Sequence, residues 1–190
     1  MNQDQIKQLN EAVEAVKTRK IENVYFVACG GSKAIFDPAQ FIFDRETTLP
    51  SFVYNANEFI HRCPKGLGEN SLVVTCSHSG NTLETTRATQ LAGDKGALTI
   101  SFSYRVDSPL WKATQHPISY VWGPESNPGD NNNGMLYRLV FSILNVLQPN
   151  EKYERAIKAC DNLGKVYEAN KAKFAESAKA FGKKYKNNKL

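Results

Sequence analysis

The sequence predicts an α/β protein in which a five-stranded parallel sheet carries helices on both faces. Short apolar runs of strand length alternate along the 190 residues with segments whose apolar residues recur at helical spacing, and this alternation is typical of parallel sheets. The runs 21–28 and 72–76 are almost continuously apolar, as expected of strands buried on both faces. A hydrophobic content of 41% is sufficient for the core of one such domain.

The elements are predicted in a regular order. Residues 2–20 show helical spacing, and the apolar run 21–28 after them predicts the first strand. Similar runs between Gly, Pro and polar breaks predict the other strands, at 52–54, 72–76, 96–101 and 118–122. Helical periodicity predicts the helices between and after them, at 34–46, 57–60, 82–93 and 135–147. Asp107-Ser108-Pro109 indicates one more helix start, with Asp107 or Ser108 as its cap.

The C-terminal stretch is a separate feature. From Tyr153 to Tyr185 apolar residues recur in steps of three and four, which predicts one long amphipathic helix or two in tandem, weakened at Gly164 and Gly182. Its apolar stripe must pack on the domain body or on a partner chain. The net charge of +5 arises here, because residues 151–190 hold eleven Lys and Arg against five Asp and Glu. We interpret this as a solvated helix face and expect no nucleic-acid partner, since no recognition motif accompanies it.

Several classes of protein are disfavoured. No apolar run approaches the length of a membrane span, and the polar residues 1–5 lack the apolar core of a secretory signal, so a cytoplasmic protein without a membrane partner is expected. The four cysteines lack C-x-x-C spacing and the three histidines are scattered, so neither a disulfide nor a metal site is expected. The turn Gly30-Gly31-Ser32 matches neither the dinucleotide fingerprint nor the Walker pattern, and no cofactor is expected.

The most informative stretch is residues 75–85, Thr-Cys-Ser-His-Ser-Gly-Asn-Thr-Leu-Glu-Thr, where an apolar strand turns directly into a helix. Its hydroxyls come from Ser77, Ser79 and Thr82. Gly80 permits a close backbone approach, and the amides of residues 80–82 are expected to point inward. Convergent donors at a helix N-terminus favour an anion, most often phosphate. The same spacing is compatible with an ordinary helix cap that has spare serines.

Other candidate residues follow neighbouring strands. Gly30-Gly31-Ser32 is a second Gly/Ser-rich turn, and the carboxyl ends of parallel strands share one edge of the sheet, where ligands bind. Glu58 is a candidate acid, base or partner for sugar hydroxyls, or else a surface carboxylate. His78 either contacts the ligand or points to solvent. Ser108, after the fourth strand, is a candidate for lining the same crevice.

Four motifs occur in a fixed order. They are Ala28-Cys-Gly-Gly-Ser32, Tyr54-Asn-Ala-Asn-Glu58-Phe59, Ser77-His-Ser-Gly-Asn-Thr82-x-Glu84-Thr85 and Asp107-Ser-Pro-Leu110. Together they resemble the sugar isomerase (SIS) domain. Within that family they resemble the fructosamine-6-phosphate deglycases, which act on fructoselysine or related Amadori phosphates. These enzymes are relatives of the isomerase half of glutamine–fructose-6-phosphate aminotransferase.

The resemblance implies a three-layer, flavodoxin-like sheet and a sugar-phosphate site. It assigns the phosphate to the loop residues Ser77, His78, Ser79, Gly80, Asn81 and Thr82. It assigns the sugar to Gly30, Gly31 and Ser32, with Glu58 and Ser108 as further candidates. In the family, a second SIS domain supplies the catalytic Glu and His in a Gly-Glu-Phe-x-His-Gly-Pro type motif, which this sequence lacks. No catalytic residue is therefore assigned here, and Glu58 is only a weak candidate.

The expectation is a phosphosugar-binding SIS domain at 1–150 and a helical extension at 151–190 that leads to an absent second SIS domain. The expected function is that of the N-terminal half of a deglycase that hydrolyses a 6-phosphofructosyl-amine to glucose 6-phosphate and the amine. The chain alone is expected to be inactive, and a homodimer is expected. Two alternatives stay open: a single-domain aldose–ketose phosphosugar isomerase that uses a partner subunit's residues, and a non-catalytic phosphosugar-sensing module.

Overall fold

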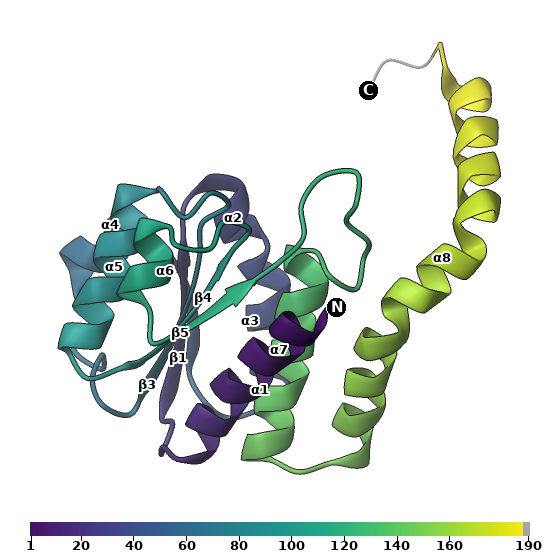
Figure 1. Cartoon of the computed structure of the whole chain (residues 1–190). Helices are drawn as coiled ribbons and strands as arrows, with labels where there is room; N and C mark the ends of the chain where they lie inside the picture. Colours follow the sequence, from purple (N-terminus) through teal and green to yellow (C-terminus); the bar gives the residue numbers. More distant parts are fainter. Residues whose placement is uncertain (188–190) are drawn as a thin grey trace.

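One parallel sheet organises the chain (Figure 1). The computed structural model describes residues 1–187 and places the five strands in the order β2-β1-β3-β4-β5. The strands are β1 (Asn23–Ala28), β2 (Ser51–Asn55), β3 (Ser71–Cys76), β4 (Leu98–Ser103) and β5 (His116–Ser119). Every neighbouring pair is parallel, and the order reverses between β1 and β3, which is the switch point where such sheets bind ligands. The predicted five-stranded parallel sheet is confirmed.

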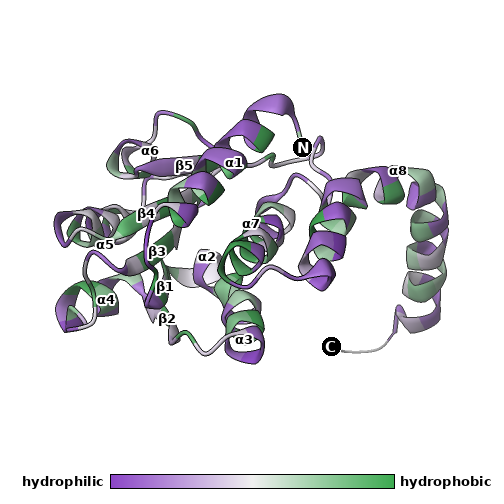
Figure 2. Ribbon diagram, turned by 90° about the horizontal axis from the view of Figure 1, so that it is seen from below, coloured by the Kyte–Doolittle hydropathy of each residue, from purple (hydrophilic) through white to green (hydrophobic). Residues whose placement is uncertain are grey.

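Helices cover both faces of the sheet (Figure 2). One face carries α4 (Ala56–Arg62), α5 (Leu83–Asp94) and α6 (Pro109–Ala113). The other face carries α1 (Gln3–Lys17), α3 (Phe36–Glu46) and α7 (Asn132–Leu147). The short helix α2 (Gly30–Ala34) joins β1 to α3, and α8 (Glu151–Tyr185) packs on the outer side of α7. Helices on both faces force the central strands to be apolar on both sides, which explains their continuous apolar runs.

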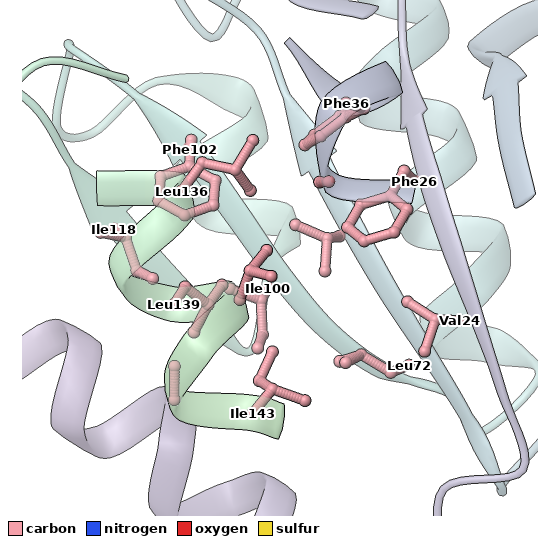
Figure 3. Packing of buried hydrophobic residues seen from close by; sticks show 14 of the residues in the cluster. Val24, Phe26, Phe36, Leu72, Ile100, Phe102, Ile118, Leu136, Leu139 and Ile143 are labelled. Atoms are coloured by element: carbon pink, nitrogen blue, oxygen red, sulfur yellow. The ribbon is translucent and has the colours of Figure 1, made fainter. Parts of the chain in front are cut away.

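The alternation of side chains along the strands divides the core in two. Val24 and Phe26 of β1 belong to the cluster on the α7 side, whereas Tyr25 and Val27 belong to the cluster beneath α4 and α5. Figure 3 shows three residues of α7, Leu136, Leu139 and Ile143, facing the strand residues of the first cluster. Because α7 lies among the sheet, α1, α3 and α8, it is apolar around most of its surface.

Several predicted boundaries are wrong, and each error has a local cause. The fifth strand, predicted at 118–122, ends at Ser119 because the Val121 amide donates instead to the carbonyl of Asp130, 2.8 Å away. It begins at His116 and includes Pro117, which an edge strand tolerates. Residues 30–34 form α2 rather than a plain turn before one helix at 34–46. The helix predicted at 135–147 begins earlier, at Asn132, because Asn131 caps it.

The outer edge of β5 is covered by the first helix. The side-chain oxygen of Gln8 accepts hydrogen bonds from both the amide and the hydroxyl of Ser119, at 2.8 and 2.9 Å. Gln5, which is buried, completes a capping box with Asn2 at the start of α1. An exposed strand edge invites pairing with other chains, so α1 protects the edge that the sheet would otherwise present.

The C-terminal stretch forms one helix, α8, not two in tandem. Its first half is attached to the domain: the Tyr153 hydroxyl donates to Glu46 at 2.9 Å, and Arg138 of α7 pairs with Asp161 at 2.8 Å. Phe174 and Phe181 in the second half are 48% and 66% exposed among the described residues. Leu163 and Val166 in the first half are also exposed, and Tyr153 is the buried residue of α8 among residues 1–187. Packing on the domain body therefore covers only part of the first half of the predicted apolar stripe. Within residues 1–187, no helix has both the length and the apolar character that crossing a membrane requires.

Gly164 has a structural reason within α8. A Cβ atom at this position would lie 2.7 Å from the side-chain oxygen of Asn127, in the loop before α7. That oxygen is already held by the Gly129 amide at 2.8 Å, and the Asn127 amide donates to Asp130 at 2.8 Å. The loop and the helix approach too closely for any larger residue, and this contact outweighs the low helix propensity of glycine.

Replacing Gly164 should therefore destabilise the protein, although glycine is a poor helix former. We expect Gly164→Gln to lower the free energy of unfolding by about 1–3 kcal/mol relative to Gly182→Gln, because overpacking costs that much. Gly182 is the matched control, since no atom of residues 1–187 beyond its own helix backbone and chain neighbours would lie within 4 Å of its Cβ. Urea unfolding of both variants measures the difference. Equal stabilities would contradict the proposed contact between the loop and α8.

Candidate functional site

The loop that joins β3 to α5, residues 77–82, is fastened to the loop that follows β4. The carbonyls of His78 and Gly80 accept hydrogen bonds from the amides of Tyr104 and Leu110, at 3.1 and 3.0 Å. Gly80 has a positive φ of +71°, and a Cβ there would lie 2.0 Å from the Ser108 hydroxyl oxygen. Only glycine satisfies both requirements. The two loops therefore form one rigid wall at the carboxyl edge of the sheet.

The hydroxyls of this loop converge. The Ser77 and Thr82 hydroxyl oxygens are 2.9 Å apart; Ser77 is buried, whereas Ser79 and Thr82 are half-buried. The Gly80 amide donates to the Ser77 carbonyl at 3.0 Å, so the expectation that this amide points into a site is wrong. The amides of Asn81 and Thr82 reach serine hydroxyls only at 3.4 Å. Contacts of that length are weak, so both amides keep donor capacity for a ligand.

The start of α5 presents further donors. Thr82 is the N-cap residue, but within residues 1–187 its side chain accepts no hydrogen bond from an α5 amide. At α1 and α7, by contrast, Asn2 and Asn131 cap the helix with their side chains. The amides of residues 83–85 have no acceptor within the helix, as at any helix start. Together with the positive end of the helix dipole they favour a bound anion.

The turn after β1 lies beside this loop, across the switch point. The Thr85 hydroxyl of α5 is 3.9 Å from the Cys29 sulfur at the end of β1. Burial raises the pKa of the Cys76 thiol to about 12, and a hydrogen bond with the Ser32 hydroxyl acts in the opposite direction. Cys76 is therefore a neutral packing residue and not a thiolate nucleophile. Among residues 1–187, apart from the chain neighbours and the nearby helix backbone, no heavy atom lies within 4 Å of the Cβ positions of Gly30 and Gly31, which leaves open space there.

The other two predicted sugar residues have different surroundings. Ser108 is buried against Gly80 and caps α6, where its hydroxyl accepts from the Trp111 amide at 3.3 Å. Glu58 lies on an exposed face of α4 and pairs with Arg62 of the same helix at 3.0 Å. Within residues 1–187, no hydrogen bond joins Glu58 to the loop 77–82. The structure thus brings Ser32, Ser108 and the loop together, and leaves the Glu58 carboxylate paired within its own helix.

His78 contacts protein, a third possibility beside the ligand and the solvent. Its Nδ1 atom lies 2.7 Å from the Tyr120 hydroxyl. Its ring centroid lies 4.6 Å from that of Tyr104 and 4.5 Å from that of Trp122. The pKa of Tyr120 is raised, chiefly by burial, so its hydroxyl stays neutral. Sequence analysis missed these three aromatic residues; the available signal was that Tyr104 and Trp122 each follow a strand at the same edge of the sheet.

Two other features lie outside this arrangement. A hollow of about 830 Å³ runs along α1 and reaches Gln115 and His116, at the opposite end of β5 from the loop. Among residues 1–187, no three His, Cys, Asp or Glu side chains gather as metal ligands would.

Comparison with known proteins gives an independent line of evidence. Residues 17–147 match the family model of the SIS domain. The chain is 44% identical over 185 residues to the fructosamine deglycase FrlB of Bacillus subtilis (strain 168), an alignment that covers 97% of this chain and 56% of FrlB. It is 34% identical over 108 residues to the fructoselysine 6-phosphate deglycase of Escherichia coli (strain K12), covering 57% of this chain and 32% of that enzyme.

A solved structure supports the same relationship. A crystal structure of a proposed phosphosugar isomerase from Bacillus subtilis superposes with a TM-score of 0.84 at 44% sequence identity. The superposition covers 95% of this chain and 56% of that one. The chain thus spans little more than half the length of FrlB and of this crystallised protein.

Gly80 offers a direct test of the wall formed by the two loops. Gly80→Ala should lower the free energy of unfolding by about 2 kcal/mol or more, because it adds backbone strain to a clash with Ser108. Ser108→Gly removes the clashing side chain but not the strain. In a double-mutant cycle measured by urea unfolding, the double variant should therefore be more stable than the sum of the two single effects predicts. Additive effects would show that the two residues do not touch.

Proposed function

Because this chain belongs to the SIS domain family, we propose that it binds a sugar phosphate whose phosphate lies in the loop 77–82 at the start of α5. The main support for this proposal is the N-terminus of α5. Among residues 1–187 it receives no side-chain cap from Thr82, and it lies beside the paired hydroxyls of Ser77 and Thr82. A phosphate would receive the hydrogen bonds that the helix start lacks. The helix dipole contributes roughly 0.3–1 kcal/mol more at an exposed terminus.

The sugar would extend from the phosphate toward the turn after β1. Gly30 and Gly31 leave open space there, and Ser32 supplies a hydroxyl next to Cys76. Ser108 lies against Gly80, and we propose that its role is to hold the loop 77–82 in position. Glu58 is retained as a candidate partner for sugar hydroxyls. Reaching the sugar would require Glu58 to give up its ion pair with Arg62, which costs little because exposed pairs contribute about 0–1 kcal/mol.

We further propose that the chain is the phosphosugar-binding part of a deglycase. The reaction would add water to a 6-phosphofructosyl-amine and release glucose 6-phosphate and the free amine. Support comes from the identity with two deglycases, one of which aligns along nearly the whole of this chain. Aldose–ketose isomerisation of a phosphosugar is the second candidate, and the similarity to a proposed phosphosugar isomerase favours it. Both reactions need an acid and a base at the sugar.

The loop hydroxyls should control affinity for a sugar phosphate. We expect Ser77→Ala and Thr82→Ala each to weaken glucose 6-phosphate binding by roughly 10- to 100-fold, since hydrogen bonds to a charged group contribute about 1.5–3 kcal/mol. Isothermal titration calorimetry measures the change. Thr18→Ala is a matched control, because Thr18 is exposed at the C-terminal end of α1, and among residues 1–187 its hydroxyl hydrogen-bonds to the Ala15 carbonyl alone. Unchanged affinity in both loop variants would refute the phosphate assignment.

Binding and turnover should separate in the 190-residue chain. Within residues 1–187, no carboxylate hydrogen-bonds to the loop 77–82, which supports the proposal that this chain does not supply both the acid and the base. We expect the chain to bind a 6-phosphofructosyl-amine. We expect free amine to be released no faster than by spontaneous hydrolysis of the same compound without protein. Amine-specific fluorescence over time measures this. Rapid release would show that this chain holds the catalytic groups, and loss of that release in Glu58→Gln would identify one of them.

A further inference from the structure

The sheet has two edge strands, and they are protected differently. The edge at β5 is covered by α1 and contains Pro117. β2 (Ser51–Asn55) forms the other edge and, among the described residues, pairs only with β1. We propose that the outer edge of β2 is the interface of a weak homodimer. In this dimer, the β2 strands of two copies pair antiparallel about a two-fold axis that passes between their Val53 residues.

The backbone of β2 presents hydrogen-bonding groups on its outer side. On the inner side, the Val24 amide of β1 donates to the Pro50 carbonyl at 3.0 Å. Successive residues of a strand bond to opposite sides, so the backbone groups of residues 50, 52 and 54 face β1 and those of residues 51, 53 and 55 face outward. Gln40 donates to the Ser51 carbonyl at 2.9 Å, whereas the amide and the carbonyl of Val53 have no partner within residues 1–187.

These outward groups are complementary to a second copy of themselves. In an antiparallel pair centred on Val53, the Val53 amide of each copy donates to the Val53 carbonyl of the other. Ser51 lies opposite the partner's Asn55, and the Ser51 carbonyl has a second lone pair to accept with, beside the hydrogen bond from Gln40. Most homo-oligomers are dimers in which the same patch of both subunits forms the contact. The β2 edge therefore supplies both halves of such an interface.

An aromatic cluster reaches this edge and stops there. The Phe52 ring stacks on Tyr25 with centroids 5.4 Å apart, and the Tyr54 ring lies 6.2 Å from that of Phe52. Phe52 is 38% exposed among residues 1–187, so the cluster ends in a partly uncovered ring. In the proposed pair, Phe52 lies opposite the partner's Tyr54, at a position where cross-strand side chains come closest. Pairing would therefore extend the cluster across the two copies.

The charge around β2 favours a second copy as the partner. Residues 47–57 contain no Asp, Glu, Lys or Arg, so two copies meet here without like charges although each chain has a net charge of +5. Proteins usually guard an open edge with a charged side chain, a proline or a bulge. β2 contains no proline, and its register with β1 runs from Ser51 to Asn55 without a bulge. The features that would block pairing are therefore missing from this strand.

The area at this edge predicts a weak dimer. Phe41 of α3 follows Gln40 at the same edge and is 63% exposed in the described part of the chain. An aromatic side chain buries roughly 150–250 Å² when fully covered, so Phe41 and Phe52 together offer about the area of one. A stable interface needs roughly 800 Å² per partner, and the short strand adds only part of the rest. We therefore expect a dissociation constant on the order of 1–100 μM.

Sedimentation equilibrium of the whole chain tests the proposal. The parent protein should be monomeric at low concentration and dimeric at high concentration. Phe52→Lys should weaken self-association by roughly tenfold or more, because it places a charge at the interface of both copies. Phe181→Lys is the matched control, since Phe181 is a 66% exposed aromatic residue on α8, and this variant should associate like the parent. Circular dichroism should show that both variants keep the parent fold.

A disulfide tests the register. Residues at a non-hydrogen-bonded antiparallel position have Cα atoms about 4.5 Å apart, which is within disulfide range. A mixture of Phe52→Cys and Tyr54→Cys chains should therefore form covalent dimers on oxidation faster than either variant does alone.

Three results would overturn the proposal. The first is a parent protein that stays monomeric at every concentration. The second is loss of association in Phe181→Lys with retention in Phe52→Lys, which would place the contact on α8. The third is equal crosslinking of the mixture and of the separate cysteine variants, which is incompatible with the antiparallel register centred on Val53.

Discussion

The contact between Gly80 and Ser108 is the constraint on which the candidate site depends. Two loops from neighbouring strands meet there with no room for a single additional carbon atom, and two backbone hydrogen bonds lock them on either side. The contact fixes the path of residues 77–82 before any ligand arrives. It also explains why the Thr82 hydroxyl lies against the Ser77 hydroxyl inside the loop and does not cap the start of α5. A loop free to relax would satisfy those amides from its own side chains.

The loop 77–82 lies at the switch point of the sheet, between the turn after β1 and the segments that follow β4 and β5. The strand order reverses between β1 and β3, so the turns after these two strands have no crossover lying over them. On one side stand the glycines and Ser32 of the first turn, and on the other stand the aromatic rings around His78. The donors named in the proposed phosphate site are backbone amides and hydroxyls. Donors of this kind would recognise the geometry of a phosphate.

Sequence analysis predicted what depends on local chemistry. The apolar runs located the strands, and the Gly/Ser turns located the carboxyl edge, because both features are written in consecutive residues. Sequence analysis could not predict the contacts of His78, because Tyr104 and Trp122 follow two other strands and are distant from His78 in the sequence. The end of the fifth strand was missed for a similar reason, because the Val121 amide finds its partner in a loop nine residues away. The single helix at 151–185 was left open because its glycines argue against continuity, and only the packing of Gly164 explains one of them.

The attachment of α1 has a consequence for the order in which the fold is completed. Gln8 holds Ser119 across 111 residues of chain, so α1, which precedes the five strands in the sequence, packs on β5, the fifth of them. Chains fold as they are synthesised, and contacts between distant residues form slowly. The capping box of α1 is formed by residues at its own N-terminus, so this helix can form before β5 is synthesised. Until β5 is in place, the apolar face of this helix stays uncovered, and the nascent chain carries the exposed surface that chaperones recognise.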